Sequence, residues 1–187
     1  GPGMEVDVAI RAHGLPTTWP PDLDEELARI PREVTAAERE GRVDLRELPF
    51  VTIDGIDARD FDDAVYCKRT RDGFQLYVAI ADVAHYVTEG TQLDDAARER
   101  GTSVYFPDRV IPMLPEALSN GICSLNPDVE RLALVCELKF SAEGIALKHR
   151  FFNGVIRSHA RLVYEDVAKW LEAPPDTLSP LQRHVQD

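Results

Sequence analysis

The sequence lacks the features that would place it in a membrane or around a structural zinc ion. No apolar run approaches the roughly 20 residues that a membrane-spanning helix requires. The cysteines, Cys67, Cys123 and Cys136, are widely spaced and surrounded by apolar residues. No CxxC motif occurs, and no histidine stands near a cysteine at ligand spacing, so a structural zinc site is not expected. We expect three buried free thiols, which suit the reducing cytoplasm.

Positive charge is also scarce. The 187 residues include 21 Lys and Arg against 33 Asp and Glu, which gives a formal net charge of −12. Modules that bind nucleic acid are usually basic, because neutralised phosphates supply most of their affinity. If this chain handles RNA or DNA, its basic surface must therefore be local or supplied by segments outside it. With 44% hydrophobic and 29% charged residues, the composition is that of a folded globular chain.

Composition divides the chain into three parts. Residues 1–3 resemble the remnant of a cleaved tag, and residues 4–47 are expected to form an N-terminal helical connecting arm. Within the arm, residues 23–41 predict a helix interrupted at Pro31, and the many charges place the arm on the surface. From residue 48 to residue 187, strand-like and helix-like segments are interleaved in one domain.

Short apolar segments separated by turn signals predict the strands of a sheet. Arg-Asp-Gly at 71–73 is a hairpin signal between the segments 63–70 and 74–83, and the second is apolar enough to lie inside a sheet. Residues 131–140 and 145–158 predict a long hairpin. Interleaved strands and helices favour an α+β fold, a mixed β-sheet flanked by helices. Helices are predicted over 91–101, over 164–173 and from 179 onward.

Aspartates crowd the segment "TIDGIDARDFDDAV", residues 52–65. Two like charges 4 Å apart repel by about 1 kcal/mol even in bulk water, and by more where water is excluded. A hard divalent cation would compensate this repulsion, because it takes carboxylate oxygens as ligands. The five aspartates are Asp54, Asp57, Asp60, Asp62 and Asp63.

The spacing of these residues limits which ion they suit. Asp54 and Asp63 stand at the ends of adjacent segments and could converge on one ion, whereas Asp62 and Asp63 point to opposite sides of an extended strand. The calcium-hand pattern fails at its required glycine and glutamate positions. Magnesium or manganese is therefore the better prediction. The alternative is a solvated loop whose aspartates form turns, and Asp57 and Asp72 are interpreted in that way.

Four stretches resemble the catalytic domain of the ribonuclease II family, and more specifically its ribonuclease R branch. The resemblance runs in order from about Leu48 to Leu171. It implies part of a ribonuclease II-type catalytic fold and a magnesium-dependent hydrolase, with manganese as a possible substitute. Such an enzyme degrades single-stranded RNA from the 3′ end to nucleoside 5′-monophosphates. The stretches are "DGIDARDFDDAV", "LYVAIADVAHYV", "TSVYFPDRVIPMLPEALSNGICSLNP" and "VIRSHARLVYEDV".

The resemblance also assigns roles to the acidic residues. Four aspartates fall on the family's active-site positions, with Asp54 and Asp63 as the most direct metal ligands. Asp60 would support the ion, and Asp62 would position the 3′-terminal nucleotide or the attacking water.

Further residues are assigned to RNA binding. Tyr105 matches a family position that stacks near the 3′ end, and Tyr164 matches another channel position, although each tyrosine could equally be part of a core. Basic residues are candidates for phosphate contacts, and Arg157 and Arg161 could instead pair with Glu165 and Asp166. The basic candidates are Arg109, Arg157, His159 and Arg161.

The resemblance implies that the family's catalytic domain continues beyond residue 187 and that RNA-binding domains flank it. Residues 48–187 would then be the N-terminal portion of the exoribonuclease domain, weak or inactive alone. Two alternatives remain from the residues. The chain could be an RNA-binding or regulatory module that keeps the fold without catalysis, or an acidic metal-binding structural domain.

Overall fold

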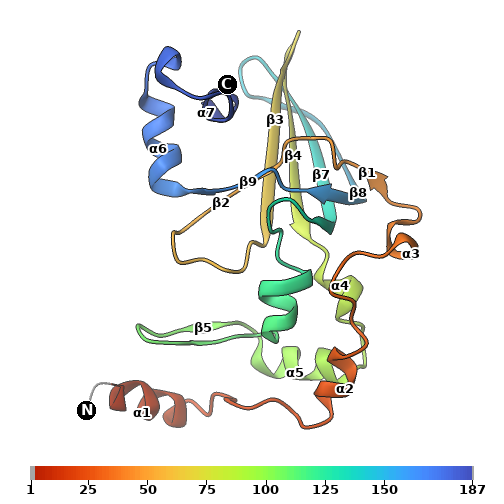
Figure 1. Ribbon diagram of the computed structural model, residues 1–187, viewed down its shortest axis with the longest axis vertical. Helices are drawn as coiled ribbons and strands as arrows, with labels where there is room; N and C mark the ends of the chain where they lie inside the picture. Colours follow the sequence, from red (N-terminus) through yellow and green to blue (C-terminus); the bar gives the residue numbers. More distant parts are fainter. Residues whose placement is uncertain (1–2, 187) are drawn as a thin grey trace.

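The computed structural model describes residues 3–186, so Gly1 and Pro2 of the predicted tag remnant lie outside the described residues. A seven-stranded sheet in the order β1-β8-β7-β4-β3-β2-β9 forms the centre of the molecule (Figure 1). Its strands are β1 (Val43–Asp44), β2 (Val51–Asp54), β3 (Asp63–Thr70), β4 (Gly73–Ala81), β7 (Glu130–Ser141), β8 (Ala146–Arg157) and β9 (Ala160–Val163).

The sheet is mixed, as the sequence predicts. Neighbouring strands are antiparallel from β8 through β7, β4 and β3 to β2, and β1 and β9 add parallel edges. Both predicted hairpins, β3–β4 and β7–β8, are confirmed. Gly73 is required at the first turn, because a Cβ there would collide with the backbone carbonyl of Phe140.

Several helices and a small hairpin lie beyond one end of the sheet, whereas the two C-terminal helices lie beside its other half (Figure 1). No helix within residues 3–186 is both long and apolar enough to cross a membrane. Thr91 caps the helix α5 (Gln92–Arg100), since its side chain accepts a hydrogen bond from the Asp94 backbone N–H. The α-helices are α1 (Met4–Ala12), α2 (Leu23–Leu27), α3 (Ala36–Arg39), α4 (Val83–Tyr86), α5 (Gln92–Arg100), α6 (Tyr164–Glu172) and α7 (Pro180–Gln186). The hairpin pairs β5 (Val104–Tyr105) with β6 (Val110–Ile111), and short turns of other helix types span Ala117–Ile122 and Pro175–Thr177.

Two sequence expectations are wrong in detail. The charged arm is not confined to the surface, because Leu23 and Val34 are buried in a core with Leu93 of α5. Charged residues fill the outward positions of the arm while these two apolar residues pack inward. Of the three cysteines, Cys123 is buried but Cys136 is only partly buried. Cys67 is exposed, since β2 pairs with β3 only near Val65 and leaves the outer part of β3 uncovered.

Glu130 ties the arm to the sheet. Its carboxylate accepts hydrogen bonds from Arg39 and from Arg46, each at 2.5 Å. Partial burial alone would raise the pKa of Glu130, but these two hydrogen bonds hold it below its usual range. These two hydrogen bonds therefore link Glu130, the first residue of β7, to Arg39 before β1 and to Arg46 after it.

We expect Glu130→Gln to lower the free energy of unfolding by about 1–2 kcal/mol at neutral pH. A carboxylate with a depressed folded-state pKa stabilises the protein above its unfolded pKa, and this stability is lost as the pH falls through the folded value. The difference between variant and wild type should therefore shrink below about pH 4 in urea unfolding experiments. Glu172→Gln, at the exposed end of α6, serves as the control. A difference that does not change with pH would contradict the prediction.

Candidate functional site

The four predicted aspartates lie at one end of the sheet. Asp54 is the last residue of β2 and Asp63 the first of β3, and the antiparallel pairing of these strands brings them together. Asp60 and Asp62 lie in the loop that joins the two strands. One strand–loop–strand unit therefore brings all four carboxylates to the same end of the sheet.

Phe61, between Asp60 and Asp62, anchors this loop in the core. The Phe61 side chain is buried, and the backbone N–H donates to Ser124 Oγ at 3.0 Å. The Phe61 carbonyl accepts from the Leu125 backbone N–H at 2.8 Å. Because Phe61 is directed inward, the carboxylates on either side of it are directed toward solvent.

Ser124 is held by a second layer of contacts. It is completely buried, and its hydroxyl lies 3.3 Å from the Arg59 carbonyl, to which it donates. The Ser124 carbonyl accepts from Arg131 Nε at 2.7 Å. Arg131 is itself buried, and its desolvation lowers its pKa. A buried cation on β7 thus supports the segment that supports the aspartate loop.

Arg161 fastens the other end of the loop. It lies opposite Thr52 in the parallel β2–β9 pairing, from where its side chain reaches the loop. One terminal nitrogen donates to the Ile56 carbonyl at 2.5 Å, and the guanidinium carbon lies 5.1 Å from the centre of the Phe61 ring. Arg161 therefore bonds to backbone atoms rather than to Glu165 or Asp166, so that predicted alternative is wrong for this arginine.

The carboxylates affect one another electrostatically. Partial burial, followed by the negative charges of Asp63 and Asp60, raises the pKa of Asp54, although the nearby Arg161 opposes this shift. The Asp62 side chain keeps much of its surface accessible to water, yet the surrounding protein atoms and the neighbouring aspartates raise its pKa. A bound cation would relieve this unfavourable concentration of charge.

The donors fit a hard divalent cation in type and charge. Asp54 Oδ2 is buried and has no hydrogen-bond partner among residues 3–186, an unfavourable state for a carboxylate oxygen. Oxygen ligands of this kind are those that Mg²⁺ takes. Over the same residues, however, no three carboxylate, imidazole or thiol groups are already close enough to form a complete ligand set.

A pocket of about 500 Å³ adjoins the aspartates, with Asp60 and Asp62 at its wall. Tyr105, at the end of β5, also lines it, and its hydroxyl donates to Asp60 Oδ2 at 3.3 Å. The Tyr105 side chain is 67% exposed, so it is not a core tyrosine. Apolar residues including Ile80 and Met113 form the rest of the wall.

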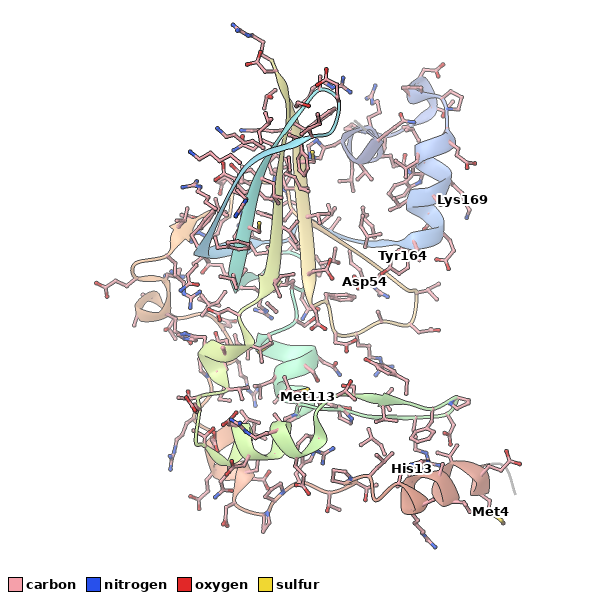
Figure 2. All side chains as sticks on the ribbon, turned by 180° about the vertical axis from the view of Figure 1, so that it is seen from behind. Met4, His13, Asp54, Met113, Tyr164 and Lys169 are labelled. Atoms are coloured by element: carbon pink, nitrogen blue, oxygen red, sulfur yellow. The ribbon has the colours of Figure 1, made fainter. Side chains whose placement is uncertain are left out.

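Tyr164 lies beside Asp54 as well. Asp54 pairs with Val163 in the β2–β9 register, and Tyr164 follows as the first residue of α6 (Figure 2). Its side chain is 58% exposed, which again excludes a core position. Two of the predicted aromatic residues thus flank the aspartate loop.

The other predicted RNA-binding residues are not gathered at the aspartates. Arg109, in the turn between β5 and β6, pairs with Asp108 and with Asp7 of α1. Arg157 pairs with Glu47 at 3.4 Å and not with Glu165 or Asp166. His159 is exposed, and its backbone N–H donates to the Phe50 carbonyl. Their roles in RNA binding stay predictions.

Sequence reasoning missed Ser124 and Arg131 as supports of the site. Arg131 had a usable signal, because a charge at the start of the apolar run "RLALV" requires hydrogen-bond partners when it is buried. Ser124 had none beyond its place in "CSLNP", since the partners of its hydroxyl are more than sixty residues away in the chain.

The sequence also matches known proteins. The sequence profile of the RNB domain matches residues 42–186. Ribonuclease R of Escherichia coli (strain K12) is 52% identical over 191 residues, which cover 100% of this chain and 24% of that protein. The chain thus spans about a quarter of the length of this relative.

Solved structures show the same fold. Mycoplasma genitalium RNase R in complex with double-stranded RNA has a TM-score of 0.88 and 32% identity, covering 97% of this chain and 32% of that one. The same protein with ribose-methylated single-stranded RNA has a TM-score of 0.86 and 34% identity, covering 94% and 27%. Yeast Ssd1, a pseudonuclease, shares the fold alone, with a TM-score of 0.68 and 20% identity over 76% of this chain and 18% of that one.

Ser124→Ala should leave the buried Phe61 N–H without an acceptor and lower the free energy of unfolding by about 1–3 kcal/mol. Hydrogen exchange measured by NMR should show faster exchange at the Phe61 amide than in the wild type. Ser119→Ala is a matched control, because that hydroxyl lines the same pocket but contacts only the Pro115 carbonyl, at 3.4 Å. Equal exchange at Phe61 in wild type and variant would show that Ser124 does not hold the loop.

Proposed function

The chain belongs to the RNB domain family, and we propose that it carries the metal-binding carboxylates of a 3′-to-5′ exoribonuclease. The observation that supports the proposal best is the concentration of four aspartates at one end of the sheet. The raised pKa values of Asp54 and Asp62 and the unpaired oxygen of Asp54 describe a site that is unfavourable without a cation.

RNA is the proposed substrate, in single-stranded form. Two structures of the Mycoplasma genitalium relative contain RNA, and nearly the whole of the present chain matches part of that relative. The pocket beside Asp60 and Asp62 combines apolar walls with an exposed tyrosine. Such a surface suits a nucleotide base, because aromatic stacking holds bases of any sequence at about 1–3 kcal/mol each.

Asp54 and Asp63 would hold Mg²⁺, with Asp60 in support and Mn²⁺ as a possible substitute. When bound, the ion supplies charge stabilisation on the phosphoryl oxygens and a water that is nucleophilic at neutral pH. Asp54 is the strongest candidate, because one of its oxygens is already buried and free of hydrogen bonds within residues 3–186. Arg161 keeps the loop in place, because its guanidinium donates to the Ile56 backbone carbonyl.

The remaining residues orient the substrate. Asp62, accessible to solvent beside the pocket, accepts a hydrogen bond from a hydroxyl of the 3′-terminal ribose or from the attacking water and so fixes its orientation. Tyr105 stacks on a base near the 3′ end, with its hydroxyl tied to Asp60. Tyr164 forms a second aromatic surface on the other side of Asp54.

The second candidate is an RNA-binding or regulatory module without catalysis. The shared fold of the yeast pseudonuclease shows that this architecture does not by itself require cleavage. The complete set of four aspartates favours the enzyme, because none of them is needed to fill the core. The activity of the isolated chain is a separate question from the competence of its site.

A chimera tests the competence of the site. Ribonuclease R of Escherichia coli is prepared with its 52%-identical segment replaced by this chain. The chimera should shorten 5′-labelled single-stranded RNA stepwise from the 3′ end in Mg²⁺. Asp62→Asn should reduce the rate at least about a hundredfold, as expected when a reacting group is misplaced, and should leave RNA affinity nearly unchanged.

The isolated chain is measured in parallel, and Asp57→Asn in the turn of the same loop is the control variant. Near-normal cleavage by the Asp62→Asn chimera would remove Asp62 from the site. A chimera that binds RNA but is inert in both Mg²⁺ and Mn²⁺ would favour the binding module instead.

Tyr105→Ala should lengthen the final product without stopping degradation, because a base near the 3′ end loses its stacking surface. Tyr105→Phe keeps the ring but removes the hydroxyl that bonds Asp60, so its end product should match the wild type. High-resolution gels of the reaction end point measure both. An unchanged product with Tyr105→Ala would exclude the stacking role.

A further inference from the structure

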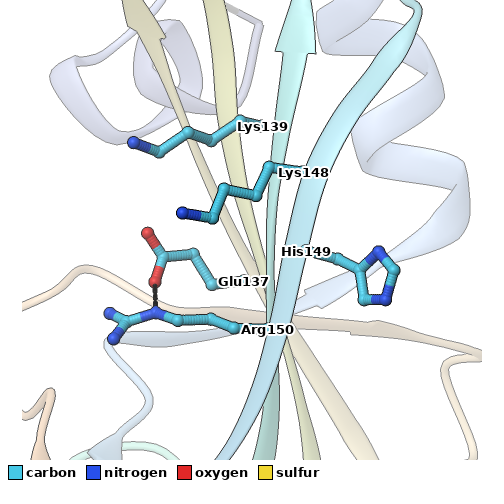
Figure 3. Close-up of a pocket in the computed structure, with 5 residues that line it drawn as sticks. All are labelled: Glu137, Lys139, Lys148, His149 and Arg150. Atoms are coloured by element: carbon cyan, nitrogen blue, oxygen red, sulfur yellow. Dashed lines mark hydrogen bonds and ion pairs between the residues drawn. The ribbon is translucent and has the colours of Figure 1, made fainter.

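A second pocket, of about 260 Å³, lies on the β7–β8 hairpin away from the aspartates. Figure 3 shows Lys139 and Lys148 pointing the same way from neighbouring strands, with the ion pair of Glu137 and Arg150 beside them. His149 points to the other side of the sheet (Figure 3). The function proposed above uses none of these residues.

The strand register extends this basic surface. Lys68, Gln75, Lys139 and Lys148 are successive neighbours across β3, β4, β7 and β8. Lys68 is five residues beyond Asp63 on β3, which corresponds to about 17 Å and to the opposite face of the sheet. Like charges placed directly opposite each other destabilise a sheet. The Lys139–Lys148 pair therefore costs the fold stability and calls for another explanation.

The one acidic residue of the pocket is engaged by other partners and forms no ion pair with these lysines. Glu137 is 7% exposed, and its two oxygens accept hydrogen bonds from Gln75 and from Arg150. Within residues 3–186, no carboxylate forms an ion pair with Lys139 or Lys148. The lysine charges thus stay available at the surface of a chain whose net charge is −12.

Arg150 is oriented by its neighbours for a further contact. Its Nε donates to Glu137, and the guanidinium carbon lies 4.7 Å from the centre of the Phe152 ring. These two contacts fix the plane of the guanidinium. Among the described residues, its two terminal nitrogens have no hydrogen-bond acceptor. A guanidinium held in this way presents a fork of donors that suits phosphate oxygens.

We propose that Lys139, Lys148 and Arg150 bind phosphate groups of an RNA strand at a site separate from the aspartates. The choice of RNA rests on the function proposed above. Three donors arriving from two strands suit a phosphate, whose oxygens point in several directions, better than a planar carboxylate. The pocket thus supplies local basic surface within an acidic chain, and it holds RNA at a distance from the site of cleavage.

The test measures binding of a fluorescein-labelled oligoadenylate to the whole chain by fluorescence anisotropy, in EDTA and over a series of salt concentrations. Lys139→Gln/Lys148→Gln should weaken binding about tenfold at low salt. The slope of log affinity against log salt should fall by about 1.4, since each phosphate contact on a single strand contributes about 0.7. Arg150→Lys keeps the charge but loses the fork, and it should weaken binding by a smaller factor.

Arg29→Gln/Arg98→Gln removes the same charge from exposed positions on the α2 and α5 side of the molecule. It should change affinity less than about twofold and leave the salt slope unchanged. Equal losses in both double variants, or no binding by the wild type, would overturn the proposal. The proposal would also fail if polyglutamate bound as tightly as RNA and lost the same affinity in Lys139→Gln/Lys148→Gln. The pocket would then be a site for acidic peptides.

Since EDTA prevents the proposed Mg²⁺-dependent cleavage, this measurement does not depend on catalysis. Failure of the exoribonuclease proposal would leave the binding result intact, and a failed binding test would leave the aspartate site untouched. Circular dichroism of each variant checks that it is folded. The lysine positions are exposed, so both double variants should fold like the wild type.

Discussion

The central constraint on this structure is the repulsion among carboxylates that must stay close together. The four aspartates of the site lie within ten consecutive positions, residues 54–63. No single helix or strand would bring them together by its own geometry. The burial of Phe61 resists their separation, because moving the loop outward would expose an aromatic ring from the core. The Phe61 backbone N–H donates to Ser124 and its carbonyl accepts from Leu125, which fixes the same residue through its backbone. The elements around the loop can be understood as supports for this one position.

This constraint explains which parts of the structure the sequence could predict. The β3–β4 and β7–β8 hairpins follow from local signals, since apolar segments flank short turns that contain Gly73 or Gly144. The concentration of aspartates is likewise visible in the chain and points to a cation. The supports of the site are not visible, because Ser124 and Arg161 reach the loop from distant segments whose register only the folded sheet defines. The burial of Leu23 was missed for a similar reason, as its partners lie on α5.

The distribution of charge gives a physical account of how an acidic chain could handle RNA. Negative charge is concentrated at one end of the sheet, where a divalent cation can convert it into attraction for phosphate. Positive charge is gathered in the half of the sheet farther from the aspartates, where the Glu137 carboxylate already accepts hydrogen bonds from Gln75 and Arg150. Net charge describes the long-range field, whereas binding depends on local sign. The value of −12 is therefore compatible with two sites that both attract phosphate.

In this fold the residues that hold the loop are different from the residues that could take part in catalysis. Membership of the family therefore does not by itself establish cleavage. Phe61, Ser124 and Arg131 are buried and hold the loop, whereas the carboxylates on either side of Phe61 fill no part of the core. A relative could lose the carboxylates and keep the loop, which is consistent with a pseudonuclease sharing the fold. The reverse also holds, since carboxylates that repel one another bring the fold no stability. Their presence here therefore supports the proposed cation, which the fold alone does not require.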